Sequence, residues 1–349
     1  MAGENSDSSA TADVTSDRPP VAVDAMGGDH APEVVVEGAR LAAERDHVPI
    51  LLVGDPDRLG DVGDLQVLAA SEVVAMDADP AVSVRRLKDS SIVRAAEAVR
   101  DGQASSVLSA GNTGAAMAAS LLRLGRIKGV SRPAIAVPFP VLDSTPTTLL
   151  DCGANPDCQP EWLVQFARMG TAYARHRFSI DRPRVGVLTI GEEAGKGNAM
   201  VKAACALLEE PEWADQCNAD YVGNVEGGDL MAGVADVIVC DGFTGNVTLK
   251  SLEGFYDIFS NSISQAVDRG GSKAGNNSAA VVAEELAPIF HHFNAKATGA
   301  AMLLGTRGVT LISHGSSSAT TIANAIRTAD EMARTDVLGR IREAVEILG

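Results

Sequence analysis

The chain has 349 residues, 46% of them hydrophobic and only 4% aromatic, and its 46 carboxylates against 29 lysines and arginines give a net charge of −17. A charge so negative argues against a nucleic-acid partner, and no apolar run is long enough to span a bilayer. The five cysteines are scattered and never in CxxC spacing, which is typical of reduced thiols in a cytoplasmic protein.

The first 19 residues are polar, and we expect them to form a disordered leader. From residue 20 to 349, apolar runs alternate with helix-like stretches, as in a single catalytic α/β domain. Strands are expected at 20–24, 49–53, 106–109, 134–138, 147–151, 184–190, 236–240 and 308–313, and weaker ones near 66–69, 72–75 and 219–222. Helices are expected at 33–46, 89–101, 113–124, 160–177, 197–210, 316–333 and 335–348. The alternation predicts βαβ crossovers and a mostly parallel sheet with helices on both faces.

One region breaks this alternation. Residues 246–296 carry no strand signal, but two apolar-periodic helices flank the polar stretch DRGGSKAGNN. This pattern predicts a helical hairpin that protrudes from the α/β body. Its apolar stripe needs a partner, and a dimer contact is the most economical explanation.

Four strands end in turns of Gly, Asn, Asp and Thr that lead directly into helices. The four stretches are VAVDAMGGDHAP, VLSAGNTGAAMAASLL, VGVLTIGEEAGKGNAMVKAA and VIVCDGFTGNVTLK. Helix starts of this kind present unpaired N–H groups and the positive end of the helix dipole. In an open parallel sheet such turns meet at the carboxyl edge. The sequence therefore predicts one composite anion pocket, with phosphate as the first candidate ligand.

The candidate anion-binding residues lie at or beside these turns and the RRLKDSS stretch. They are Asp24, Gly27, Gly28, Lys88, Asp89, Ser90, Asn112, Thr113, Gly114, Asp241, Gly242, Thr244, Gly245, Asn246, Lys250 and His314. Ser90 or Asp89 is expected to cap a helix while Lys88 reaches over the pocket. His314 is expected to have only an auxiliary role in anion binding. Asp24 and Asp241 are expected to orient lysines and loops.

Several known motifs are excluded. GEEAGKG has one residue too few between Gly191 and Gly195 for a Walker A loop, and Gly197 replaces the magnesium-binding Ser or Thr. No GxGxxG follows a strand, and no GxSxG occurs. DCGANPDC lacks both metal-ligand spacing and a nearby His, so no metal site is predicted.

Two clusters of basic residues interrupt the acidic chain. One contains Arg123, Arg126, Lys128 and Arg132 within ten residues, and the other contains Arg168, Arg175, Arg177, Arg182 and Arg184. Solvated helix faces would explain either cluster alone. Two of them on an acidic protein suggest docking of an acidic macromolecule.

From Val21 onward the chain resembles the bacterial phosphate acyltransferase family of phospholipid synthesis. The resemblance rests, in the family's order, on AVDAMGGD, RRLKDSSI, SAGNTGA, LGRIKG, RPAIA, LLDCGAN, IGEEAGKGN, VGNVEG, VADVIVCDGFTGNVTLK and SHGSS. It implies a three-layer α/β/α sandwich, a homodimer, and no metal or organic cofactor. It also implies transfer of a fatty acyl group from acyl-[acyl carrier protein] to inorganic phosphate. The acyl phosphate would pass to a membrane-embedded glycerol-3-phosphate acyltransferase, so the cytoplasmic enzyme could associate peripherally with the membrane.

The family analogy also implies residue roles. Lys196, Asn198 and Asn224 are expected to be catalytic, stabilising the oxyanion and phosphate. The N–H groups of 112–114 and 244–246 would cradle phosphate, with Lys88 and Lys250 as counter-charges. Because phosphate is already anionic and the leaving thiol has a pKa near ~8.5, direct attack requires no Ser, Cys or His nucleophile. The acidic carrier protein is expected to dock on Arg123, Arg126, Lys128 and Arg132.

The chain departs from the family pattern at two places. Gly228 stands where family members usually carry Arg, and the hairpin tip RGGSKAGNNSAA is too polar to favour membrane contact. Three other functions stay open: a phosphotransacetylase-like enzyme that uses acyl-CoA, a metal-dependent dehydrogenase, and a non-catalytic scaffold that binds acyl carrier protein. The dehydrogenase is disfavoured because no acidic metal cluster is evident.

Overall fold

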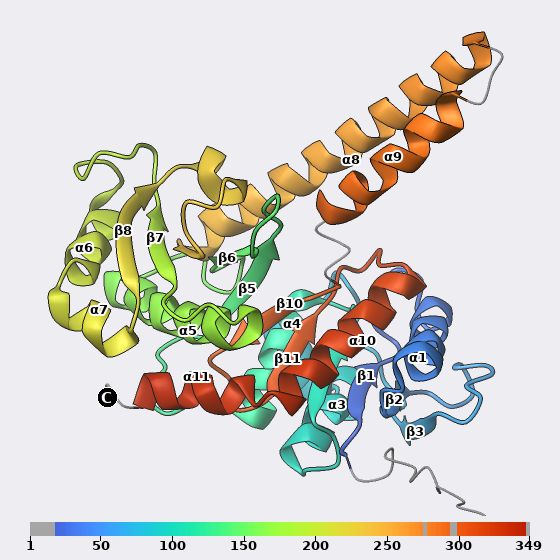
Figure 1. Ribbon diagram of the computed structural model, residues 1–349. Coiled ribbons are helices and arrows are strands. Elements are labelled where there is room, and N and C mark those ends of the chain that lie inside the picture. The colour runs from blue at the N-terminus through green and yellow to red at the C-terminus, as the bar shows by residue number, and fades with distance from the viewer. Residues whose placement is uncertain (1–17, 275–277, 294–298, 347–349) are drawn as a thin grey trace, which may run out of the picture.

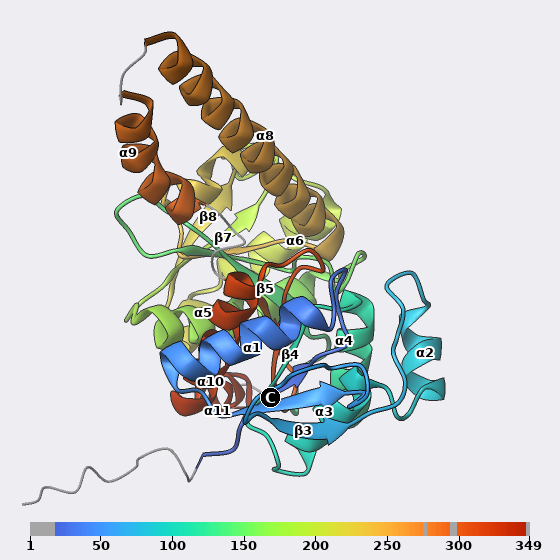
Figure 2. The ribbon, with the colours of Figure 1, turned by 90° about the vertical axis from the view of Figure 1, so that its right-hand side faces the viewer.

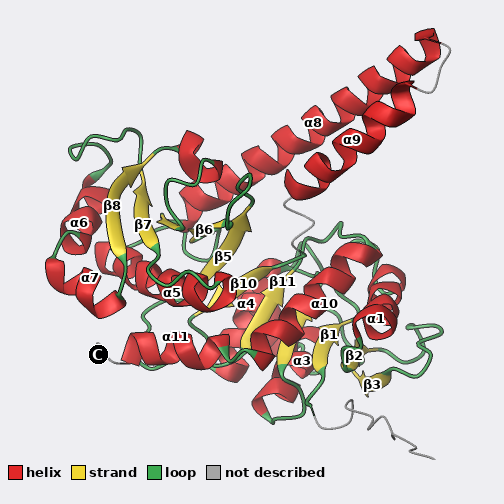
Figure 3. Cartoon of the chain, in the orientation of Figure 1, coloured by secondary structure: helices red, strands yellow, loops and turns green. Residues whose placement is uncertain are grey.

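A computed structural model of the chain describes residues 18–274, 278–293 and 299–346. Within these ranges, eleven strands form one sheet in the order β3-β2-β1-β4-β11-β10-β5-β6-β9-β7-β8 (Figures 1 and 3). The strands are β1 (Val21–Asp24), β2 (Ile50–Gly54), β3 (Gln66–Ala69), β4 (Ser106–Ser109), β5 (Ala134–Phe139), β6 (Thr147–Leu150), β7 (Arg184–Leu188), β8 (Asp220–Val225), β9 (Val237–Val239), β10 (Ala301–Leu304) and β11 (Val309–Ile312). The predicted α/β fold with a mostly parallel sheet is confirmed.

Helices cover both faces of the sheet. They are α1 (Glu33–Asp46), α2 (Pro80–Arg86), α3 (Ser91–Arg100), α4 (Thr113–Ala119), α5 (Pro160–Phe178), α6 (Ala199–Leu208), α7 (Pro211–Cys217), α8 (Gly242–Ala274), α9 (Ser278–Phe293), α10 (Ala319–Arg334) and α11 (Val337–Glu346), with a π-helical turn η1 (Ser120–Leu124) and a 3₁₀ turn η2 (Gly227–Met231). Successive strand residues point to opposite faces. Val21 and Val23 therefore join the core under α1 and α10, whereas Ala22 joins the core under α3 and α4.

The direction of the strands reverses in the middle of the sheet. β10 is antiparallel to both β11 and β5, and β5 is antiparallel to β6. Three reversals make β6, β9, β7 and β8 run opposite to β1, β4 and β11. The carboxyl ends of the two halves therefore do not share one simple edge, and β10 and β5 form the switch point between them.

The predicted hairpin is present as α8 and α9, which project from the α/β body (Figure 2). α8 begins at Gly242, four residues before the predicted boundary, and its 33 residues span about 50 Å. Leu249 and Leu252 at its base pack on a third core cluster, which includes Phe139 and Leu303. Parts of several predicted segments lie outside the described residues: 1–17 of the leader, 275–277 of the hairpin tip, 294–296 of the second hairpin helix and 347–348 of the last helix.

Some elements differ from the prediction. Residues 72–75 are not a strand, because Glu72 forms only an isolated bridge with Ser90. The short helices α2 and α7 were not predicted, although both begin with Pro at the first helical position, a known start signal. β10 was not predicted either. Its residues, AMLL, have no β-branched side chain, so pairing with β5 and β11 decides its conformation.

Candidate functional site

A polar pocket of about 140 Å³ lies over β5 and β10, where strand direction changes. Its walls come from the β4–α4 turn, the β6–α5 turn, the β11–α10 turn and the first turns of α8. Its polar lining consists of Thr113, Cys152, Asn246, Lys250, Glu253, Ser313, His314, Ser317 and Thr321. The pocket thus brings together four of the predicted residues, Thr113, Asn246, Lys250 and His314. The turns that line it follow the carboxyl ends of β4, β6 and β11, and ligands of open α/β sheets bind at such strand ends.

Lys250 and His314 are two residues of this pocket whose side-chain nitrogens can donate to an anion. The Lys250 Nζ donates a hydrogen bond to Glu253 Oε2 over 2.8 Å. The Nδ1 of His314 accepts from the Ser316 N–H over 3.1 Å. In the neutral imidazole the proton therefore resides on Nε2, which can donate to an anion.

The first turn of α8 is held by internal hydrogen bonds. Asp241 Oδ1 accepts from the Thr244 N–H, and Oδ2 accepts from the Thr244 hydroxyl, each over 2.8 Å. The Gly245 N–H donates to the Asp241 carbonyl and the Gly242 N–H to the Asn155 carbonyl. Asp241 is thus a helix cap, and the N–H groups expected at residues 244 and 245 to cradle phosphate already have acceptors.

Asp151, which the sequence analysis did not single out, organises this side of the pocket. Its fully buried carboxylate accepts from the N–H groups of Ile135, Ala154 and Asn155 over 2.6–3.1 Å. Burial raises the pKa of the Asp151 carboxyl. A Cβ on Gly245 would lie 1.9 Å from the Asp151 carbonyl oxygen, so the close approach of α8 requires glycine there. Asp151 lies in the LLDCGAN stretch, directly after a strand, and this position is the sequence signal that could have identified it.

Cys152 lines the pocket, and its thiol donates a hydrogen bond to the Leu149 carbonyl. Burial, with a contribution from the neighbouring Asp151 carboxylate, raises the pKa of Cys152 well above its usual value. The thiol is therefore neutral at physiological pH, and a neutral thiol is a poor nucleophile.

The β1–α1 and β4–α4 turns pack against each other beside the pocket. The buried Asp24 carboxylate accepts from the Ser109 hydroxyl over 2.7 Å, and burial raises its pKa. A Cβ on Gly27 would lie 2.8 Å from the Gly111 nitrogen in the β4–α4 turn, so these turns meet through backbone. Gly28, with φ of 126°, lies against the carbonyl of Gly315 in the β11–α10 turn.

Asn112 caps α4, and Gly114 packs beside it. The Asn112 Oδ1 accepts from the Ala115 N–H over 3.0 Å, and Nδ2 donates to the Met76 carbonyl over 2.8 Å. A Cβ on Gly114 would lie 2.5 Å from Pro80 Cγ. The first N–H groups of a helix have no intrahelical acceptor, and of residues 112–114 it is Thr113 that lines the pocket.

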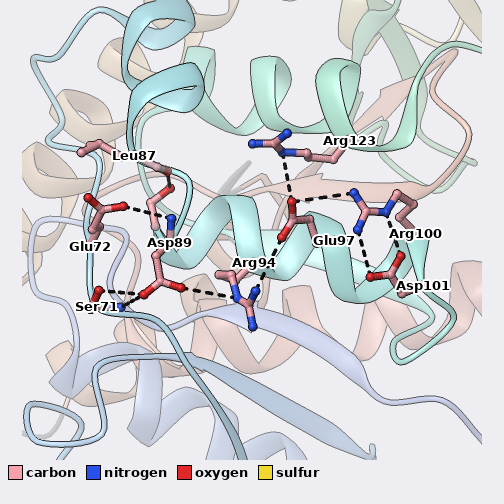
Figure 4. A network of polar contacts seen from close by, with 10 residues as sticks. Ser71, Glu72, Leu87, Asp89, Arg94, Glu97, Arg100, Asp101 and Arg123 are labelled. Carbon is pink, nitrogen blue, oxygen red and sulfur yellow. Dashed lines mark hydrogen bonds and ion pairs between the residues drawn. The ribbon is translucent and has the colours of Figure 1, made fainter.

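The 88–90 stretch belongs mainly to a structural network (Figure 4). Asp89 accepts from the N–H and hydroxyl of Ser71, which lowers the pKa of its carboxyl. The Ser90 hydroxyl donates to the Leu87 carbonyl, and its oxygen accepts from no N–H group of the first turn of α3, so the expected side-chain cap is not formed. Lys88 is exposed. None of the three lines the polar pocket among the residues described.

Lys196, Asn198 and Asn224 form a separate group at the carboxyl ends of β7 and β8. Lys196, 46% exposed, pairs with Glu193 at 3.6 Å, and the Asn224 Nδ2 donates to the Glu193 carbonyl over 2.7 Å. Asn198 caps α6 through the Val201 N–H. In the described part of the chain these three residues do not line the polar pocket. Gly228, next to this region, has open space around its Cβ position.

The first basic cluster, Arg123, Arg126, Lys128 and Arg132, lies at the opposite end of the strands from the pocket. The Arg307 Nε, in the turn before β11, donates to the Leu124 carbonyl, whereas His314 follows the other end of β11. Arg123 pairs with Glu97 at 3.4 Å (Figure 4). Arg126 donates to the Ser131 carbonyl, and the Arg132 guanidinium stacks over Trp162 at 4.9 Å. Lys128 is exposed.

No three His, Cys, Asp or Glu side chains of the described ranges gather as a metal ion would require. In the same ranges, no helix combines the length and hydrophobicity needed to cross a bilayer.

Comparison with solved structures defines the class of fold. The chain is similar to a branched-chain phosphotransacylase from Enterococcus faecalis V583, with a TM-score of 0.58 and 15% identity over 90% of this chain and 98% of that one. It is also similar to the EutD phosphotransacetylase from Staphylococcus aureus, with a TM-score of 0.56 and 15% identity over 90% and 94% of the two chains. The fold is therefore that of the phosphotransacylases.

Sequence comparison is more specific. Residues 20–340 match the family described as "Fatty acid synthesis protein". The chain is 44% identical to the phosphate acyltransferase of Desulforudis audaxviator over 92% of this chain and 94% of that protein. It is 46% identical to the phosphate acyltransferase of Pelotomaculum thermopropionicum over 93% and 95%. The chain belongs to the phosphate acyltransferase family and is an enzyme that transfers an acyl group to phosphate.

Proposed function

We propose that the acyl donor is acyl-[acyl carrier protein] and that the product is acyl phosphate for glycerophospholipid synthesis. The observation that carries this proposal is the polar pocket over β5 and β10, where Lys250, His314 and the start of α4 surround a space suited to a small anion. The single continuous sheet supports the prediction that residues 20–349 act as one catalytic domain.

In the proposed reaction, a phosphate oxygen attacks the thioester carbonyl carbon directly. The C–S bond then breaks, and the sulfur leaves as a thiolate. Lys250, the His314 Nε2–H, the Asn246 side chain and the N–H groups of Thr113 and Gly114 would bind phosphate. The raised pKa of Cys152 supports a route without a cysteine nucleophile. Enzyme groups then need only to position the reactants and stabilise the tetrahedral oxyanion.

Lys196, Asn198 and Asn224 remain the proposed oxyanion-stabilising group. Their clustering around the Glu193 loop supports a common role. β7 also neighbours β9, whose end carries Asp241 and the start of α8. Their separation from the residues that line the pocket makes a direct test of Lys196 necessary.

Docking of the acidic carrier protein on Arg126, Lys128 and their neighbours is supported by charge complementarity. This cluster lies near the start of β11, whereas the pocket lies near its end. Docking there would require the acyl group to extend from one end of the strands to the other. Kinetics with donors that lack the carrier can therefore separate docking from chemistry.

We also propose a homodimer formed through α8 and α9. Phe243, Val247 and Ile258 on α8 are 66%, 49% and 71% exposed, and their spacing places them on one side of the helix. Apolar faces of this kind are usually covered by a partner. Ile258→Asp should halve the mass measured by analytical ultracentrifugation, whereas an unchanged mass would contradict this contact.

The product would pass to a membrane-embedded glycerol-3-phosphate acyltransferase. This proposal rests on the chemistry of acyl phosphate, a reactive mixed anhydride with an apolar chain, which favours consumption close to where it is made. Peripheral membrane contact would serve such a hand-off.

Hydroxylamine trapping tests the donor and the product together. We expect acyl hydroxamate from the carrier-linked thioester only when phosphate is present. Hydroxamate from the CoA ester alone would assign the enzyme to phosphotransacetylase-like chemistry. No hydroxamate from either donor, with carrier protein still bound, would favour a non-catalytic scaffold.

A further inference from the structure

A second cavity, of about 240 Å³, lies at the base of the hairpin between α8, α9 and the end of β5. It is lined largely by aromatic and aliphatic side chains, among them Phe139, Phe255, Phe259, Phe290 and Phe293. These are five of only eight phenylalanines in a chain with 4% aromatic residues. Such a concentration at one cavity indicates a site for an apolar ligand or partner.

This apolar groove adjoins the polar pocket. Glu253 lines both cavities. Along α8, Leu249 and Lys250 face the polar pocket, and Leu252 and Tyr256 face the groove. Residues three or four apart are neighbours on a helix surface. A ligand with one polar and one apolar end could therefore occupy both cavities at once.

The groove is preformed by contacts that join its walls. The Tyr256 hydroxyl donates to the Phe290 carbonyl over 2.7 Å and links α8 to α9. His292 Nε2 lies 3.1 Å from the Val141 carbonyl and links α9 to the segment after β5. At the floor, Phe139 belongs to the third core cluster and Leu252 packs against it.

We infer that this groove binds the hydrocarbon chain of the fatty acyl donor, with the thioester carbonyl at the polar pocket. The inference rests on the proposed function and specifies where chain length is recognised. The outer side of α8, with Phe243, Val247 and Ile258, suits a second copy, whereas the groove lies between α8 and α9 over a floor that includes the buried Phe139. Each further methylene that enters an apolar site should strengthen binding about fourfold.

The test uses carrier-linked donors of increasing chain length and the full-length enzyme, with hydroxamate formation as the readout. Leu252→Trp fills the floor of the groove. We expect it to lower kcat/KM for long-chain donors at least about 16-fold, the equivalent of two or more lost methylenes, and to change kcat/KM for the shortest donor less than twofold. Phe255→Ala at the rim should shift the preference toward longer chains. Val82→Trp, on the exposed side of α2, controls for the bulk of the new side chain.

The outcomes separate the two proposals. Activity with the shortest donor shows that the Leu252→Trp variant has folded. A loss of kcat/KM for long-chain donors alone then supports binding of the acyl chain in the groove. An equal loss for every chain length, or none, would overturn it while leaving the acyl transfer to phosphate intact. A change in mass by ultracentrifugation without a chain-length effect would assign the groove to a second copy. Absence of hydroxamate from the wild-type enzyme with all donors would reject the proposed function itself.

Discussion

Lys250 Nζ and Glu253 Oε2 lie 2.8 Å apart on α8, at the point where the polar pocket meets the apolar groove. The ion pair keeps a cation at the pocket, but it also places a carboxylate beside any anion that enters. The Glu253 side chain is only 17% exposed, so solvent screens it incompletely. Phosphate must therefore compete with Glu253 for Lys250.

Replacing Glu253 with Gln should lower the KM for phosphate. Repulsion between unit charges 4 Å apart ranges from about 1 kcal/mol in water to about 4 kcal/mol at an effective dielectric constant of 20. We expect a decrease of at least about fivefold in steady-state kinetics, the lower end of that range. Glu212→Gln, on exposed α7, is the matched control. An increased KM would mean that Glu253 assists phosphate binding.

Removing the cation should have the opposite effect. Lys250→Ala is expected to raise the KM for phosphate by about 10- to 100-fold, the range for one hydrogen bond to a charged group. Lys202→Ala, on the exposed face of α6, provides the control. Phosphate kinetics identical to wild type would exclude Lys250 from the anion site.

The catalytic role proposed for Lys196 predicts a different signature. Lys196→Ala should lower kcat about 10²–10³-fold, as when one oxyanion donor is lost, and preserve the fold because its partner Glu193 is exposed. Single-turnover measurements against Lys202→Ala will show the effect. A decrease below tenfold, with normal carrier binding, would leave the chemistry to the residues of the polar pocket.

Charge reversal tests carrier docking. Arg123 is bound to Glu97 in the network of Figure 4 and Arg126 to the Ser131 carbonyl, so Lys128→Glu is the cleaner change. We expect a higher KM for the carrier-linked donor, a weaker salt dependence and an unchanged kcat. The CoA ester should be unaffected. If the variant has the same kinetics as wild type at every salt concentration, the carrier docks on another surface.

The pH dependence of stability should report Asp24. Burial raises the pKa of this carboxyl above its ordinary value of 3.8, so the folded state holds the proton more tightly than the unfolded chain. Its contribution to the free energy of unfolding is then complete below pH 3.8 and decreases as pH rises through the raised pKa. In the Asp24→Asn variant, the side chain at position 24 does not titrate, so this variant is the reference. Thermal melts should show wild type losing stability relative to this variant as pH rises, whereas parallel curves would contradict the assignment.

The sequence was sufficient to predict the local elements of the fold. Val- and Ile-rich runs predicted β1, β4, β7 and β11, because such side chains suit strands that are covered on both faces. The two apolar-periodic helices after residue 246 predicted the hairpin. The turns rich in Gly and Asn marked the strand-to-helix junctions, because capping and close backbone contacts depend on nearby residues.

Only the tertiary structure decided how these junctions combine. β10 has no strand-forming sequence of its own, and yet its antiparallel pairing with β5 and β11 begins the reversal of half the sheet. That reversal places Lys250 and His314 in one pocket and leaves Lys196 outside its lining. Sequence spacing describes neighbours along the chain, whereas strand order and direction depend on packing among segments hundreds of residues apart. The local pattern therefore identified the candidate lysines, and the sheet topology determined which of them lines the pocket.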